Sequence, residues 1–474
     1  MNIFKSIWHS LKYSKVYYMN DRATHGGESV PFKAVKLLRD AGLKDMVKPG
    51  ATVGIKIHTG NYGNSANLRP QWVRAIVEEV QRMGANPVIV ETNLNINAMG
   101  GDRQDTKQHR KIINRHGFNE QTMGCPIWLC EGPFEFDDVK CEVPHGVYLN
   151  HTFTPRRMTK LDTIIVVSHF KGHLQGTYGG AIKNIGIGMA SNRGKSATHF
   201  LNHPEFGLHS GVVNQEVAQQ MMQAPHPNFI DGIINNCAFD CFAVEDGEFV
   251  FHREKCKDCS ACYYPTLFSG LMQFSNTLMT TTPTCIADSC AGIMNKLGKE
   301  KFIFVNYAYD ITPSCDCDNK HDAAVIPNIG TFVSKDPVAV DMACLEACEA
   351  ASVNPGSAFD APGLAEPNSD RFTHGSSLAQ VSQWCQINSG VFNGIGESEY
   401  ELVESEPLSE AEVSSWIQDY DFTNPIGKRY RDQIRAFHFD TEGPTAVSEP
   451  RLPLEDQIKR PAGLVKNSKI SDEQ

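Results

Sequence analysis

The sequence lacks long apolar runs and lacks an excess of basic side chains. No apolar run approaches the roughly 20 residues that a membrane-spanning helix needs. The 474 residues carry 55 acidic and 44 basic side chains, a formal net charge of −11, whereas general nucleic-acid binding needs a positive field. We therefore expect no transmembrane segment and no nucleic-acid partner.

The sequence also lacks a signal peptide at its start. Charged residues interrupt the apolar positions of residues 1–20, and no small-residue cleavage site follows them. This pattern predicts a short amphipathic helix that docks on the body of the protein or on a partner. Without a targeting segment, we expect a cytoplasmic protein.

Glycine-rich motifs that bind nucleotides are absent as well. Residues 176–188 contain five glycines, but not in the order G-x-G-x-x-G after a strand. Residues 194–196 read Gly-Lys-Ser, yet the glycine that a P-loop places five residues earlier is missing. We therefore expect neither NAD nor ATP as a cofactor.

Cysteine, by contrast, is abundant. The chain has 15 cysteines, and a cytoplasmic protein keeps its thiols reduced. The odd number also argues against complete disulfide pairing. Free thiols and metal ligands are the expected roles.

Four short apolar runs predict buried strands of an α/β fold. They lie at residues 51–58, 87–91, 163–167 and 302–306, and a helical pattern at 70–84 separates the first two. Strand, helix and strand at this spacing form a βαβ unit with a right-handed crossover. We expect a largely parallel sheet with helices on both faces.

Changes in composition and in hydrophobic pattern divide the chain into four segments. Residues 1–229 and 271–350 carry the α/β pattern and are expected to form one core. Residues 230–270 are rich in cysteine and predict a small ferredoxin-like hairpin insertion. Residues 351–474 predict an irregular and helical C-terminal extension with a flexible tail.

The strongest chemical signal is the triplet Cys256-x2-Cys259-x2-Cys262. Three thiolates at this spacing can wrap three corners of a cubane, and the same triplet opens the ferredoxin motif. The fourth cysteine of that motif would stand at position 266, where this chain has Thr266. In two-cluster ferredoxins the fourth cysteine serves the other cluster, so its absence leaves this site intact.

Cys241 is positioned to supply the missing ligand from upstream. The segment 241–256 resembles the hairpin that joins the two halves of a ferredoxin, with a turn at residues 246–247. We expect one [4Fe–4S] cluster on Cys241, Cys256, Cys259 and Cys262. A four-cysteine zinc knuckle is the alternative. The sequence leaves open whether Cys237, Cys285 or Cys290 contributes a ligand.

Polar side chains follow each expected strand at its carboxyl end. These ends share one edge of a parallel sheet, where ligands of α/β folds bind. Expected catalytic residues are His58, His169, Lys171 and His173. Expected substrate-binding residues are Lys56, Lys183, Asn184, Lys195, His199, Cys315 and Cys317. Taken singly, each lysine reads as a surface residue, but the set predicts a cationic crevice for a small anionic ligand.

Cys315-Asp316-Cys317 admits several interpretations. Two cysteines separated by one residue after a strand can hold a soft metal, and this makes a second metal possible. They can equally lie beside a reactive centre or serve as small residues in a turn. Cys344 and Cys348, at helical spacing, are most simply core residues.

Several of these segments resemble one known family. They are residues 53–70, 168–195 with Ser-His-Phe-Lys-Gly-His and Gly-Gly-Ala-Ile-Lys-Asn, 310–317, and 334–341. In this order they resemble the family of domain of unknown function 362, a group of iron–sulfur proteins. The resemblance implies the fold and the cofactor, and it implies no single reaction.

The leading interpretation is an iron–sulfur redox protein. It would deliver electrons from one [4Fe–4S] cluster to chemistry on an anionic ligand in the histidine, lysine and cysteine crevice, and it would need a redox partner protein. One alternative is an electron-transfer or assembly subunit without its own catalysis. Another is a metal-dependent, non-redox enzyme that uses His169, His173 and Cys315.

Overall fold

The structure is a computed structural model of the whole chain. It describes residues 13–94, 103–131, 137–201, 203, 205, 207–224, 228–257, 259–275 and 278–416. The chain divides into a unit of residues Met1–Val413 and a unit of residues Ser414–Gln474. Of the second unit, only residues 414–416 are described.

The strands of the described residues fall into one large sheet and four two-stranded sheets. Their bounds are β1 (Ser14–Asn20), β2 (Thr52–Lys56), β3 (Asn86–Glu91), β4 (Ile127–Leu129), β5 (Asp138–Glu142), β6 (His151–Pro155), β7 (Thr163–His169), β8 (Lys171–His173), β9 (Thr177–Gly179), β10 (Val212–Val213), β11 (Phe242–Glu245), β12 (Glu248–Phe251), β13 (Met272–Gln273), β14 (Phe302–Ala308), β15 (Gly330–Ser334) and β16 (Tyr400–Glu404).

The helices alternate with these strands over the first half of the chain and dominate later. Their bounds are α2 (Val30–Asp40), α3 (Leu43–Met46), α4 (Pro70–Arg82), α5 (Thr106–Arg115), α6 (Glu120–Met123), α7 (Ala181–Gly186), α8 (Asn192–Phe200), α9 (Gln215–Gln223), α10 (Asn228–Asn236), α11 (Tyr263–Phe268), α12 (Leu278–Leu297), α13 (Pro337–Ala350), α14 (Arg371–Gly375), α15 (Cys385–Phe392) and α16 (Glu410–Trp416).

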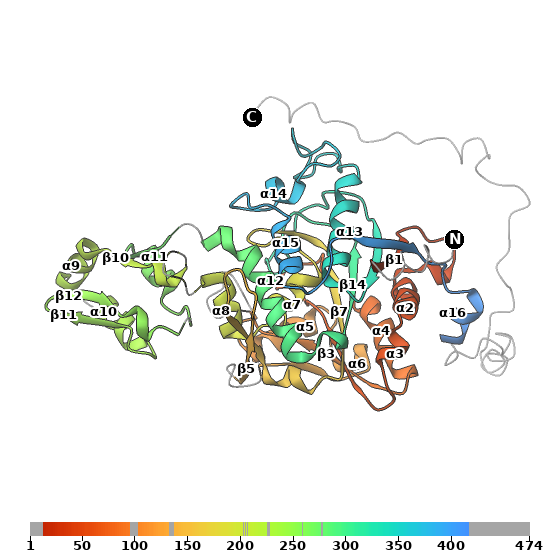
Figure 1. The fold of residues 1–474 in the computed structure, drawn as a ribbon, viewed down its shortest axis with the longest axis horizontal. Coiled ribbons are helices and arrows are strands. Elements are labelled where there is room, and N and C mark those ends of the chain that lie inside the picture. The colour runs from red at the N-terminus through yellow and green to blue at the C-terminus, as the bar shows by residue number, and fades with distance from the viewer. Residues whose placement is uncertain are drawn as a thin grey trace, which may run out of the picture. The chain divides into compact units, whose positions relative to one another are not determined.

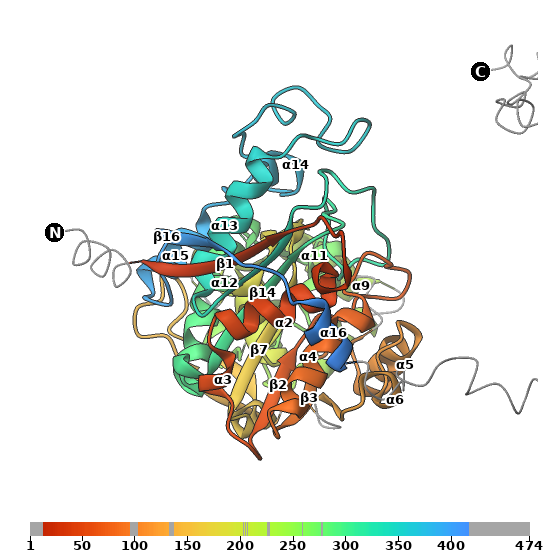
Figure 2. The same cartoon turned by 90° about the vertical axis from the view of Figure 1, so that its right-hand side faces the viewer.

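The central sheet has eight strands in the order β16-β1-β15-β14-β7-β2-β3-β4. All four strands expected from the sequence are present, and β14, β7, β2 and β3 run parallel to one another, as does β4. Only β15 runs antiparallel to its neighbours β14 and β1. Figure 2 shows β1 and β16 beside each other at one end of the sheet. The expected α/β class with a largely parallel sheet is confirmed.

Helices cover both faces of this sheet (Figures 1 and 2). α2 and α4 pack on one face, where they meet Ile165 and Val167 of β7. α7, α12 and α13 pack on the other, where they meet Ile164 and Val166. Successive side chains of a strand point to opposite faces, so β7 is apolar on both sides because both sides are buried.

The cysteine-rich segment folds as the expected hairpin. β11 and β12 pair in antiparallel fashion around Asp246 and Gly247, whose φ angles of 50° and 83° define the type I′ geometry that suits a two-residue turn. Phe242 and Phe249 stack inside the hairpin. The same small apolar cluster includes residues of α9, α10 and β13, so this folded segment reaches beyond the expected range of 230–270. Figure 1 shows these elements grouped together.

Both ends of the chain differ from the sequence-based expectation. Residues 14–20 form strand β1 instead of part of an amphipathic helix, and residues 1–12 lie outside the described part. The C-terminal extension contributes edge strand β16 as well as helices. No helix in the described ranges is long and apolar enough to cross a membrane.

Candidate functional site

A cavity of about 560 Å³ lies at the carboxyl ends of β2, β3 and β7. The loop that follows β14 closes another side with Cys315 and Cys317. The structure brings eleven of the expected site residues together around this space: Lys56, His58, His169, Lys171, His173, Lys183, Asn184, Lys195, His199, Cys315 and Cys317. The common edge of parallel strands is what places them there.

The glycine-rich segment after β7 folds into a tight hairpin and a buried helix. β8 pairs with β9, and Gly172 lies so close to the Pro313 carbonyl that an added Cβ would be 2.2 Å from its oxygen. Helix α7 begins after Gly180, where the carboxylate of Asp341 accepts hydrogen bonds from the first two helical N–H groups. This capping fixes the helix that carries two of the expected binding residues.

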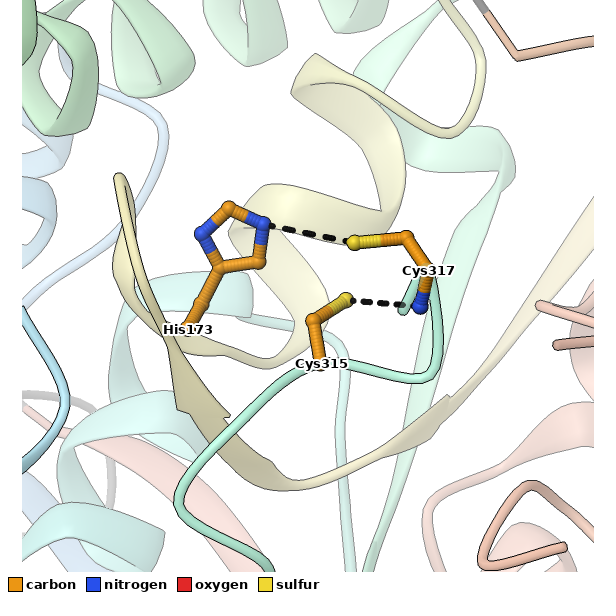
Figure 3. Close-up of side chains that lie close together, drawn as sticks. All are labelled: His173, Cys315 and Cys317. Atoms are coloured by element: carbon orange, nitrogen blue, oxygen red, sulfur yellow. Dashed lines mark hydrogen bonds between the residues drawn. The ribbon is translucent and has the colours of Figure 1, made fainter. Parts of the chain in front are cut away.

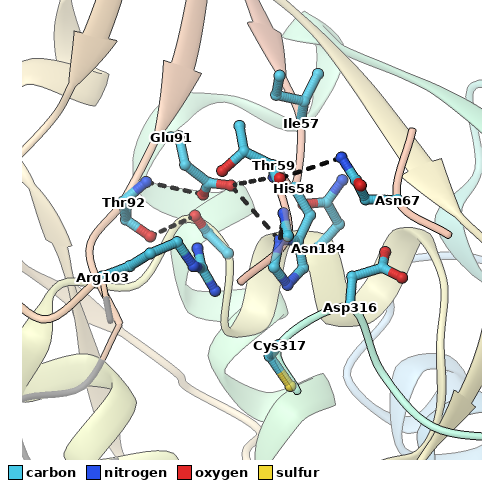
Figure 4. A network of polar contacts seen from close by, with 12 residues as sticks. Ile57, His58, Thr59, Asn67, Glu91, Thr92, Arg103, Asn184, Asp316 and Cys317 are labelled. Carbon is cyan, nitrogen blue, oxygen red and sulfur yellow. Dashed lines mark hydrogen bonds and ion pairs between the residues drawn. The ribbon is translucent and has the colours of Figure 1, made fainter. Parts of the chain in front are cut away.

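Lys56 and Glu91 form a buried ion pair that lines the cavity. Lys56 Nζ lies 2.8 Å from Glu91 Oε1 and 3.0 Å from Asn184 Oδ1. Burial would raise the pKa of Glu91, but the charge of Lys56 and of neighbouring groups lowers it to about 2. Glu91 also accepts the Thr59 and Thr92 backbone N–H groups, as Figure 4 shows. The carboxylate therefore stays anionic and rigid.

Asp316 organises a second buried ion pair. Its carboxylate lies 2.9 Å from Lys171 Nζ and 3.0 Å from His169 Nδ1. Burial works against the charge, yet His169 and Lys171 hold the pKa of Asp316 well below its usual range. The other His169 nitrogen lies 2.8 Å from the Tyr309 carbonyl oxygen. Both ring nitrogens of His169 are thus taken up by protein groups.

His173, Cys315 and Cys317 form a compact group (Figure 3). Their ligand atoms lie within 4.8 Å of one another, which is close enough for one metal ion. The Cys317 N–H donates to Cys315 Sγ at 3.3 Å, and Lys183 Nζ lies 3.7 Å from the same sulfur. Burial would raise the pKa of Cys315, but the Cys317 thiol and the Lys183 charge lower it well below its usual value.

Two cations of the cavity have no carboxylate partner among the residues that the structure describes. Lys56, Lys171 and Lys195 pair with Glu91, Asp316 and Glu131, the last at 3.6 Å. Arg103 and Lys183 line the same space without such a pair. His199 also faces it, and its Nδ1 atom is buried and has no hydrogen-bond partner in the described ranges. The uncompensated charge suits an anionic ligand.

The Lys195–Glu131 pair is poised to exchange a proton near neutral pH. Burial raises the pKa of Glu131 to about 7, and burial lowers the pKa of Lys195 to about 8. Glu131 Oε1 has no hydrogen-bond partner within the described part of the chain. His58 and His199 differ, because burial lowers the pKa of His58 to about 4 and that of His199 to about 3. Both rings are therefore neutral at pH 7.

Five cysteines gather on the hairpin insertion. The Cys241 N–H donates to Cys237 Sγ at 3.3 Å. Burial, the Cys237 thiol, and the charges of Cys256 and Cys262 raise the pKa of Cys241. Burial and the neighbouring Cys256 and Cys259 raise that of Cys262 to about 12. The ligand set with Cys241 stays a prediction, with Cys237 as a fifth thiol in reach.

The other two candidate ligands lie elsewhere. Cys285 and Cys290 are fully buried on α12, and they belong to apolar clusters that contain none of the five hairpin cysteines. Cys344 and Cys348 lie in the apolar core on α13, where core residues were expected.

Helix α8 connects the cysteine triplet with the cavity. Ser260, which stands between Cys259 and Cys262, hydrogen-bonds to Ser196 through its hydroxyl group at 3.1 Å. The rings of Phe200 and Tyr263 lie 4.6 Å apart between their centroids. Lys195, His199 and Phe200 of the same helix line the cavity, as does Tyr264 next to the triplet.

The family model of domain of unknown function 362 (DUF362) matches residues 53–346, which is more than half of the chain. The chain belongs to the DUF362 family. The matched region runs from β2 to α13 and contains every residue that lines the cavity except Leu378. The cavity is thus part of the DUF362 domain.

Other comparisons add little to this assignment. No curated protein matches the chain. Among solved structures, the lactate racemase apoprotein from Thermoanaerobacterium thermosaccharolyticum is similar at 9% identity and a TM-score of 0.31, over 56% of this chain and 45% of that chain. The chain spans less than half the length of that protein, and we draw no functional argument from so distant a likeness.

Sequence reasoning missed several residues of this DUF362 site. Asp316 stands between two expected cysteines, so its position was the available signal. Arg103 and Glu131 lie in segments without a motif, and no sequence pattern indicated that they belong to the site. The same is true of Phe200 and Tyr264, which also line the cavity.

Proposed function

We propose that this DUF362 protein is an iron–sulfur redox protein that carries electrons to an anionic ligand in the cavity. The observation that carries the proposal is the position of α8, which touches the cysteine triplet through Ser196 and the cavity through Lys195 and His199. A cluster on the hairpin would therefore lie one helix away from the ligand.

The five hairpin cysteines fit a [4Fe–4S] cluster by their chemistry. Burial and the neighbouring thiols raise the pKa values of Cys241 and Cys262, so thiolates gather there only when a cation neutralises them. Thiolate is the ligand that such clusters use, and Cys241, Cys256, Cys259 and Cys262 are the proposed four. When bound, the cluster would supply one-electron transfer.

The cavity residues would bind the ligand and supply protons. Arg103 and Lys183 have no carboxylate partner among the described residues and would hold the anionic group. The Lys195–Glu131 pair would give or take a proton as electrons arrive, because its two pKa values of about 8 and about 7 bracket neutral pH. Lys171 and Asp316 would keep the neighbouring loop in place.

Iron and sulfide analysis with electron paramagnetic resonance (EPR) tests the cluster. Anaerobically purified protein should contain about four irons and four sulfides per chain and give a cluster signal after dithionite reduction. Cys256→Ser should lose that signal. Cys385→Ser is the matched control, because Cys385 is a partly exposed thiol on α15 and should leave the iron content unchanged. One zinc per chain without iron would contradict the proposal.

A further inference from the structure

We propose that Cys315 is a nucleophilic thiolate that forms a covalent bond with an anionic, electrophilic ligand in the cavity. The proposal concerns the cavity alone and does not depend on a cluster being present. It goes beyond electron delivery because it assigns bond formation to a residue of the chain itself.

Hydrogen-bond donors surround the sulfur of Cys315. The backbone N–H of Cys317 and the ammonium group of Lys183 approach it, at 3.3 Å and 3.7 Å. Cys315 also interacts electrostatically with His58 and His173, and His173 Nε2 lies 3.7 Å from the neighbouring Cys317 Sγ. A buried sulfur that faces a backbone N–H group and an ammonium group is stabilised as an anion.

Backbone N–H groups determine which ring nitrogen of His58 and of His173 carries the proton. His58 Nδ1 accepts the Gly60 N–H at 3.1 Å. His173 Nδ1 accepts two, from Gln175 at 3.1 Å and from Gly176 at 2.7 Å. A nitrogen that accepts an N–H carries no proton itself, so each neutral ring holds its proton on Nε2. His173 therefore donates its Nε2 proton toward the Cys317 sulfur, and neither ring offers Nδ1 as a free base to deprotonate Cys315.

The same bonds argue against a metal ion on His173, Cys315 and Cys317. A neutral histidine that ligates a metal through one nitrogen donates the proton of the other to an acceptor. His173 Nδ1 instead faces two backbone N–H donors. The arrangement of these three residues therefore favours a negative charge on sulfur over a bound metal ion.

The bond-forming step needs no oxidant or reductant. The Cys315 thiolate gives an electron pair to an electrophilic carbon of the ligand, an S–C bond forms, and the leaving group departs with the electron pair of its own bond. Lys183 reaches both the sulfur and the cavity, and Arg103 interacts electrostatically with His58 and Cys317. These two cations would hold the negative group of the ligand beside the nucleophile.

Paired alkylation with iodoacetate and iodoacetamide tests the proposal on the full, anaerobically prepared chain. The two reagents are matched in shape and leaving group and differ in charge. Fragment mass spectrometry should find Cys315 modified at pH 7 about tenfold faster or more than Cys385, a partly exposed thiol whose pKa burial raises. Iodoacetate should be the faster reagent at Cys315 and should have no such advantage at Cys385.

A variant separates recognition of the anion from general reactivity. Lys183→Met should cut the advantage of iodoacetate at Cys315 by about tenfold, because one of two uncompensated cations is gone. Lys320→Met is the matched control, since Lys320 is an exposed lysine on the same loop as Cys315 and does not line the cavity. It should leave the ratio unchanged.

Three outcomes would overturn the proposal. The first is slower modification of Cys315 than of Cys385. The second is the same preference between the reagents at both cysteines. The third is protection of Cys315 that a chelator removes with release of one metal ion, which would make the cysteine a ligand. If the chain contains no cluster but its Cys315 is labelled rapidly, the proposed redox function is contradicted. The inference about Cys315 is then still supported.

Discussion

The hydroxyl groups of Ser196 and Ser260 lie 3.1 Å apart and join helix α8 to the loop between two cysteines of the triplet. Ser196 is adjacent to Lys195, which lines the cavity, and Ser260 is adjacent to Cys259. This contact lies between the two sites that the sequence marks as chemical. A change in one site has a short covalent and hydrogen-bonded path to the other.

Anion binding should depend on Lys183. Because this lysine has no carboxylate partner in the described part of the chain, removing its charge should weaken binding of malonate or inorganic phosphate by about tenfold, or about 1.4 kcal/mol. Isothermal titration calorimetry on Lys183→Met measures this. Lys320→Met, exposed and outside the cavity, should bind as the unmodified chain does. Equal affinity in all three proteins would contradict the assignment of the cavity to an anion.

Glu131 should make stability depend on pH between about 4.5 and 7. Its pKa is raised from 4.5 to about 7 by burial, so the folded chain binds this proton more tightly than the unfolded chain. The stabilising contribution is complete below pH 4.5 and is lost as the pH rises through 7. Lys195, with its pKa lowered to about 8, titrates above this window.

Urea unfolding of Glu131→Gln at several pH values measures this contribution. The free energy of unfolding of the unmodified chain should fall relative to that of the variant by on the order of 1–3 kcal/mol between pH 5 and 7.5. The difference between the two proteins removes the contribution of all other groups. Parallel pH profiles would show that Glu131 has an ordinary pKa.

Asp341 should be a positioning residue for α7. Its carboxylate accepts the Ala181 and Ile182 N–H groups at 2.7 Å and 3.0 Å and the Asn306 amide at 2.7 Å. Asp341→Ala leaves these buried donors unsatisfied and should cost about 1–3 kcal/mol in the free energy of unfolding. Asp341→Asn keeps one acceptor oxygen and should cost less. Equal losses for both variants in urea unfolding would contradict this role.

The parallel strands of the core could be predicted because the sequence patterns that indicate them are local. Ile164, Ile165, Val166 and Val167 are β-branched and consecutive, which only a strand buried on both faces requires. The strands toward the β1 end of the sheet were harder to predict from the sequence. Tyr17 and Tyr18 of β1 pair with residues 332–333, more than 300 positions away, and no local pattern records such a partner. Helix α12, with Pro283 inside it, was missed for a similar reason, since proline normally ends a helix.

The position of the cavity could be predicted from one topological rule, but its ion pairs and hydrogen bonds could not. Polar residues at the ends of parallel strands converge, so His58, His173 and Lys183 could be named from the sequence. Which cations lack a carboxylate depends on distances between segments far apart in the chain, as with Lys195 and Glu131. The direction of each hydrogen bond at His173 likewise depends on a loop conformation that composition does not encode.

A redox titration followed by EPR, with and without malonate, tests the coupling of cluster and cavity most directly. If electrons on the hairpin and an anion in the cavity affect each other, malonate must shift the midpoint potential, by 59 mV for each tenfold difference in affinity between the two redox states. We expect a shift of about this size in the unmodified chain and a smaller shift at the same malonate concentration in Lys183→Met, which binds malonate about tenfold more weakly. An unchanged potential in a chain that calorimetry shows to be saturated with malonate would contradict it.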